Sequence, residues 1–171
     1  IWTLWLIYMI YDKKRLEQLL LTVQKPGRYT GGEVNEVVKD KSKIDVRFAF
    51  CFPDTYEIGM SHLGMKILYS LFNERDDIWC ERVFAPWIDF EKVMRDENIP
   101  LYALESRDSI RDFDFVGFTL QYELSYTNIL TMLDLGGIPL KACDRDESYP
   151  IVVAGGPCTC NAEPLADFID I

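Results

Sequence analysis

Residues 44–64 read IDVRFAFCFPDTYEIGMSHLG, and this stretch decides the fold of the chain. Residues 44–52 are a short, nearly continuous apolar run rich in aromatic and β-branched side chains, which is typical of a strand buried on both faces. Pro53 ends the strand because proline has no N–H for a sheet hydrogen bond. Ser61 is a favourable helix N-cap, and apolar residues at helical spacing follow it. The stretch therefore predicts a strand, a loop and a helix in succession.

The rest of the chain alternates between strand-like and helix-like segments in the same way. Buried strands are predicted over residues 45–52, 78–84, 114–120 and 151–155, and residues 168–171 read as the start of a last strand. Helices are predicted between these strands, the last of them over residues 123–135. Right-handed crossovers between parallel strands place helices on both sheet faces. The predicted fold class is α/β: a doubly wound, mostly parallel five-stranded sheet of Rossmann-like type.

The composition limits the classes of function. The chain has 171 residues, 49% of them hydrophobic, which predicts a globular domain with a real core. A formal net charge of −10 argues against nucleic acid as a partner, since phosphate binding needs clustered Lys and Arg. The five cysteines show no disulfide spacing, so we expect a reducing, cytoplasmic compartment. Cys158 and Cys160 are too close in sequence for the usual zinc pair, and no metal site is predicted.

The first 43 residues are predicted to form an N-terminal extension to the α/β domain of residues 44–171. Apolar residues at helical spacing predict a helix over residues 12–23. Residues 1–10, IWTLWLIYMI, are shorter than the about 20 residues that span a bilayer, so no membrane association is expected. They also lack the basic start and cleavage site of a signal peptide, and we expect them not to be native to the fold.

Unusual side chains follow three of the predicted strands, in residues 54–62, 119–123 and 155–157. Because the carboxyl ends of parallel strands meet at one edge, these loops are expected to form one ligand site, without catalytic residues. The predicted site residues are polar, aromatic or conformationally permissive: Asp54, Tyr56, Gly59, Ser61, His62, Thr119, Gln121, Tyr122, Gly155, Gly156 and Pro157. Structural roles compete with this interpretation. Asp54 and His62 can cap a helix, Tyr56 can pack as a core aromatic, and the two adjacent glycines can form a tight turn.

Motifs in these loops resemble a cobalamin-binding domain. That family carries Asp-x-His-x-x-Gly after its first strand, Ser-x-Leu after a middle strand, and Gly-Gly after the next. The corresponding residues here are Asp54-x-Tyr56-x-x-Gly59, Thr119-x-Gln121 and Gly155-Gly156. Tyr56 stands where the family has its cobalt-ligating histidine, and a phenol with pKa about 10 is a poor substitute for imidazole. The resemblance therefore implies that a bound cobalamin has no protein histidine on cobalt.

Four longer runs resemble the amino-terminal region of a subgroup of cobalamin-binding-domain radical S-adenosylmethionine (SAM) proteins. They read KPGRYTGGE, CFPDTYEIGMSHLGMKILY, FTLQYELSYTNIL and VVAGGPCTCNAEPLADFID. The resemblance implies a downstream radical SAM barrel, as the partner of this domain, which holds a 4Fe-4S cluster and SAM on a Cys-x-x-x-Cys-x-x-Cys site. That spacing is absent from these 171 residues, so the chain is expected to stop before the barrel.

Two functions remain open at this point. The first is a cofactor-binding module that positions a corrinoid or a substrate over the downstream barrel. The second is a degenerate Rossmann-like domain without cofactor, which acts as a structural or substrate-recognition module; Tyr56 in the histidine position favours it. A phospho-receiver is disfavoured because it needs an acidic pair after the first strand and a Lys after the last, and only Asp54 and Glu57 are at hand. A flavin domain is disfavoured because no Ser/Thr-rich phosphate loop follows the first strand.

Overall fold

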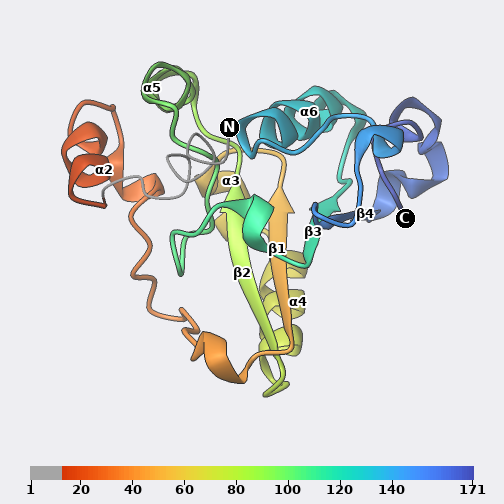
Figure 1. The fold of residues 1–171 in the computed structure, drawn as a ribbon, viewed down its shortest axis with the longest axis horizontal. Helices are drawn as coiled ribbons and strands as arrows, with labels where there is room; N and C mark the ends of the chain where they lie inside the picture. The colour runs from red at the N-terminus through yellow and green to blue at the C-terminus, as the bar shows by residue number, and fades with distance from the viewer. Residues whose placement is uncertain (1–12) are drawn as a thin grey trace.

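A computed structural model of the chain describes residues 13–171. The expectations for residues 1–10, and for a helix beginning at residue 12, lie outside this range. Helices and strands alternate from β1 onward (Figure 1): α2 (Lys13–Leu20), β1 (Val46–Phe52), α3 (Tyr56–Ser61), α4 (Leu63–Asn73), β2 (Ile78–Phe84), α5 (Ile88–Glu97), β3 (Phe115–Thr119), α6 (Tyr126–Leu135) and β4 (Ile151–Gly155). Short 3-10 turns connect them at Pro26–Arg28, Lys41–Lys43, Ile110–Asp112, Glu123–Ser125, Ala142–Asp144, Pro157–Asn161 and Glu163–Leu165. Among residues 13–171, no helix is long and apolar enough to cross a membrane.

The four strands form one sheet in the order β2-β1-β3-β4, and every pair is parallel. The α/β class and the parallel pairing are therefore confirmed, whereas the prediction of five strands is wrong for residues 13–171. Asp170 N–H donates to the Val152 carbonyl at 2.9 Å and Ala154 N–H donates to the Ile171 carbonyl at 3.0 Å. The last two residues thus lie along β4, but the Asp170 carboxylate also accepts the Val152 N–H at 2.8 Å in place of a backbone partner.

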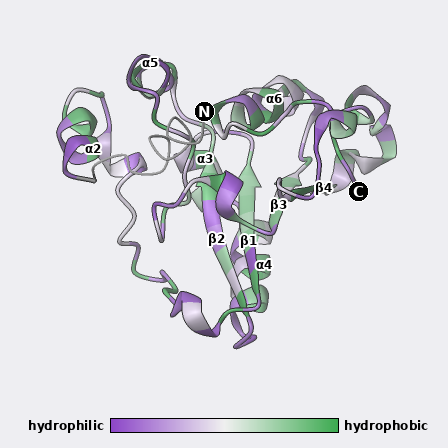
Figure 2. Cartoon of the chain, in the orientation of Figure 1, coloured by the Kyte–Doolittle hydropathy of each residue, from purple (hydrophilic) through white to green (hydrophobic). Residues whose placement is uncertain are grey.

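Alternation along β1 divides the core into two layers. Phe50 and Phe52 face α4 and pack with its Met65 and Tyr69. Ala49 and Cys51 face the other side and belong to the larger cluster, which includes buried residues of α5 and α6. Side chains of a strand alternate between faces, so a continuous apolar run buries both. Figure 2 shows the resulting hydrophobic character of β1 and β3 at the centre of the chain.

The N-terminal part packs onto the same core. Leu16, Leu20 and Val23 are buried in the larger cluster, and Tyr29 stacks near Phe90 with ring centroids 4.2 Å apart. The following linker runs along the β2 edge, where the Val37 carbonyl accepts the indole N–H of Trp79 at 2.9 Å. The division of the chain at residue 43 stays a prediction.

Three helix boundaries differ from the sequence prediction. The N-terminal helix, predicted to reach residue 23, ends at Leu20. Ser61 is the last residue of α3, and its hydroxyl donates to the Glu57 carbonyl at 2.7 Å. The N-cap of α4 is His62, because its Nδ1 accepts the Met65 N–H at 3.1 Å. The predicted helix over residues 123–135 begins instead as a 3-10 turn, and its first residues, including the exposed Leu124, lie outside α6.

Candidate recognition site at the sheet switch point

The strand order places a topological switch point between β1 and β3. From β1 the chain moves to β2 on one side, and β3 lies on the other side, so the loops after β1 and β3 diverge. Ligands of open α/β sheets bind in the crevice outside the carboxyl ends of such strands. The two loops are in contact here. The Tyr122 hydroxyl donates to the Asp54 carboxylate, and the Asn128 side chain donates to the Pro53 carbonyl at 2.9 Å.

His62 joins this cluster through both ring nitrogens. Its Nδ1 accepts the Met65 N–H, so the ring proton of the neutral form is on Nε2. Nε2 is 3.1 Å from Gln121 Oε1 and donates to it, and the Gln121 amide in turn donates to the Thr119 hydroxyl. The imidazole therefore has no free lone pair to offer a metal while this chain of hydrogen bonds is intact.

The loop after β4 closes the same edge. Leu120 N–H donates to the Gly155 carbonyl at 2.7 Å, and Cys158 N–H donates to the Leu120 carbonyl at 3.0 Å. Gly156 has φ +127°, and a Cβ there would lie 2.8 Å from the Leu120 oxygen, so glycine is required for the two backbones to approach. Gly155, Gly156 and Pro157 are exposed and remain accessible from solvent.

Tyr56 and Gly59 lie away from this polar cluster. The Tyr56 hydroxyl donates to Glu33 in the N-terminal linker, and its ring packs edge-on to Phe84 at 5.5 Å. Burial and the neighbouring Glu33 carboxylate raise the pKa of Tyr56 to about 12. A Cβ on Gly59 would strike the Phe84 ring, so Gly59 serves the packing of α3. The structure therefore brings together the other polar site residues but not these two, nor Ser61, whose hydroxyl bonds within α3.

The electrostatics of the cluster favour a neutral phenol beside a carboxylate. The hydrogen bond to Asp54 and, second, burial raise the pKa of Tyr122 to about 12. Tyr122 thus remains a donor at neutral pH, and it is 38% exposed. Asp54 also accepts the Thr55 N–H at 2.7 Å. A carboxylate, a phenol hydroxyl and an amide thus lie together at this edge, each of them bonded within the cluster.

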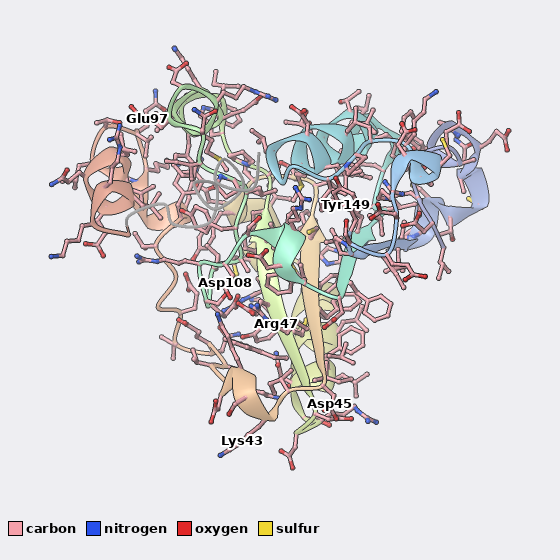
Figure 3. The ribbon with its side chains drawn as sticks, in the orientation of Figure 1. Lys43, Asp45, Arg47, Glu97, Asp108 and Tyr149 are labelled. Carbon is pink, nitrogen blue, oxygen red and sulfur yellow. The ribbon has the colours of Figure 1, made fainter. Side chains whose placement is uncertain are left out.

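Sequence reasoning missed a group of buried charges on β1 and β2, away from the carboxyl ends of the strands. In β2 the fully buried Glu81 accepts from Arg47 of β1 at 2.5 Å, and Arg47 also pairs with Asp108 at 2.9 Å. Figure 3 shows Arg47 and Asp108 close together beside the strands. The next residue, Arg82, pairs with the buried Glu105 at 2.6 Å on the opposite face. Adjacent opposite charges inside an apolar strand were the signal that could have identified them.

A corrinoid with a protein ligand on cobalt does not fit these residues. Tyr56 is committed to Glu33, and both nitrogens of His62 are in use. Within residues 13–171 there is also no group of three His, Cys, Asp or Glu side chains that could hold a metal ion. The edge carries hydrogen-bonding side chains and the exposed residues Gly155, Gly156 and Pro157.

Comparison with known proteins identifies the family. Residues 64–171 match the family described as radical SAM proteins, N-terminal. This chain belongs to that family. An uncharacterised protein of Methanocaldococcus jannaschii is 29% identical over 130 residues, which cover 75% of this chain and 23% of that protein. The chain thus spans less than a quarter of the length of this relative. No solved structure matches the chain.

The matched range covers only part of the switch point. It includes the loops after β3 and β4, and therefore Gln121, Tyr122 and Gly156. It begins at Gly64, after the loop that carries Asp54 and His62. The family match therefore identifies the chain as a module of a radical SAM protein. The roles of Asp54 and His62 are argued from the geometry of this chain alone.

Proposed function

We propose that this module recognises a small organic molecule at the β1–β3 switch point on behalf of a radical SAM enzyme. The observation that supports it best is the convergence of Asp54, His62, Gln121 and Tyr122 at the edge where open α/β sheets bind ligands. The carboxylate and the amide oxygen suit a ligand with hydroxyl or amine donors. A following domain supplies the 4Fe-4S cluster and SAM, and cofactor chemistry there performs the difficult step.

The test uses the full-length protein, reconstituted anaerobically with iron and sulfide. Formation of 5′-deoxyadenosine from SAM is measured with and without the small-molecule fraction of a cell extract. We expect stimulation by the extract, and we expect Gln121→Ala and Tyr122→Phe to reduce that stimulation at least tenfold. Lys92→Ala, at an exposed position of α5, is the matched control and should retain it. Equal stimulation of all variants would contradict a recognition role for the switch point.

Cobalamin binding is the second candidate, and the motif around Gly155 and Gly156 favours it. Because Tyr56 and His62 are engaged elsewhere, a corrinoid would bind with no protein nitrogen on cobalt. Titration with hydroxocobalamin decides between the candidates. Retention of the corrinoid, with a spectrum that His62→Ala leaves unchanged, supports the cobalamin module. If the protein does not retain the corrinoid, the cobalamin module is rejected and recognition of another small molecule is the function that is left.

A further inference from the structure

Among residues 13–171, no helix covers one half of one sheet face. On the α6 side of β3 and β4, Val116, Phe118 and Val152 are at most 2% exposed. On the α4 side of the same strands, Phe115 and Val153 are only partly buried, and Ile151 is 42% exposed. Parallel sheets are normally covered on both faces by helices. In Figure 1, α4 lies behind β1 and β2 and does not extend across β4.

Aromatic stacking joins this uncovered half to the flank of α4. The Phe48 ring lies over Gly117, where a Cβ would strike it, and its centroid is 5.0 Å from Phe72 and 6.2 Å from Phe115. Leu68 lies one turn before Phe72 on α4 and is 42% exposed. The β3–β4 apolar surface is defined by these side chains and by the register partners on β4: Phe48, Leu68, Phe72, Phe115, Ile151 and Val153.

We propose that this surface docks an amphipathic helix from the part of the same polypeptide that follows the module. The surface consists of side chains on the flank of α4 and side chains on the neighbouring strands. This arrangement suits one helix that lies parallel to α4 with its apolar stripe facing the sheet. The inference rests on the proposed function in one respect, namely that a further domain follows this one.

The occupant is assigned to the same chain for three reasons. First, the relative from M. jannaschii is more than four times as long as the matched segment, so that protein carries ample polypeptide beyond the module. Second, the backbone of Asp170 and Ile171 already lies along β4, bonded to Val152 and Ala154. Third, each copy of this chain has a formal net charge of −10, which opposes pairing of two copies through a shared face.

Photo-crosslinking of the full-length protein tests the proposal. A benzoylphenylalanine at position 151 should capture a peptide from the later part of the same chain, at a yield independent of protein concentration. The control carries the same probe at position 67, because Ile67 is 56% exposed on α4 but outside the surface. We expect its yield of that peptide to be at least fivefold lower.

Two results would overturn the inference. A crosslinked dimer whose yield rises with concentration would identify a second copy as the occupant. Absence of any captured peptide would show that the surface remains open. Neither result affects the switch-point test, since that test measures extract-stimulated SAM cleavage. Conversely, capture at position 151 together with unaltered stimulation in Gln121→Ala would support docking and reject recognition.

Discussion

Arg47→Met is expected to lower the free energy of unfolding, because it leaves the buried Glu81 carboxylate in β2 without its counter-charge. Glu81 is 0% exposed, and Arg47 Nη2 lies 2.5 Å from its Oε1. The other Glu81 oxygen accepts the Ser106 N–H at 2.8 Å, so that bond survives the substitution. Methionine can keep much of the apolar contact that Arg47 makes with Trp79 and Phe113, whose ring centroids lie 5.3 and 4.1 Å from its guanidinium. The main loss is the counter-charge of a desolvated carboxylate.

Removing one partner of a buried ion pair costs about 3–5 kcal/mol. With a urea m-value of about 2–3 kcal/mol/M, the unfolding midpoint should fall by roughly 1–2.5 M. Lys92→Met is the matched control, because the Lys92–Asp96 pair is exposed on α5 and contributes about 0.3–0.5 kcal/mol.

A double variant separates charge from packing. Glu81→Gln neutralises the carboxylate while keeping an oxygen for the Ser106 N–H, so Arg47→Met with Glu81→Gln should be more stable than Arg47→Met alone. Urea unfolding followed by circular dichroism measures all four proteins. A stabilising role for the buried Arg47–Glu81 pair is refuted if Arg47→Met and Lys92→Met shift the midpoint equally, or if the double variant is the least stable of the four proteins.

Two further predictions concern the loops at the carboxyl edge. Gly156→Ala should lower the free energy of unfolding by about 1–3 kcal/mol, because φ is +127° and a Cβ would lie 2.8 Å from the Leu120 oxygen. Gly155→Ala is the control: a Cβ there has nothing within 4 Å, so the free energy of unfolding should change by less than about 0.5 kcal/mol. Thermal or urea unfolding measures both. Hydrogen bonds from Arg28 and Lys25 lower the pKa of Glu57 to about 2, although burial acts in the opposite direction. The contact therefore stabilises the fold at pH values above the unfolded-state pKa of about 4.3, and this stabilisation is lost as the pH falls toward 2. Carboxylate NMR should show the Glu57 midpoint returning toward 4.3 in Arg28→Leu; an unmoved midpoint would contradict the assignment.

The strands could be predicted because their signal is local. The apolar run of β1 and the similar runs of β2, β3 and β4 each mark a segment buried on both faces, and Pro53 and Gly156 mark where two of them end. The convergence of the three loops then follows from parallel pairing alone. A fifth strand was predicted from residues 168–171, but only two of these hydrogen-bond to β4.

The orientation of individual side chains could not be predicted in the same way. Tyr56 was aligned with a metal-ligand position, but α3 begins at that residue and directs its hydroxyl to Glu33, a partner from the N-terminal linker. Ser61 and His62 are adjacent and both can cap a helix. The choice of His62 depends on the short α3, which uses Ser61 at its own C-terminus. Such outcomes depend on tertiary contacts that no local pattern contains.

The hydrogen bonds at the switch point also bear on how the proposed recognition would depend on the following domain. Asp54 is bonded to Tyr122, and His62 to Gln121, so a ligand must replace internal bonds rather than meet free groups. Exchange of one hydrogen bond for another yields little net free energy, on the order of 1 kcal/mol each. The isolated module should therefore bind its ligand weakly. A following domain that packs over this edge and excludes water would strengthen the same bonds, since charged and polar contacts gain energy as the local dielectric falls. Under the proposed function, recognition would therefore belong to the assembled protein, and the module would supply the donor and acceptor pattern.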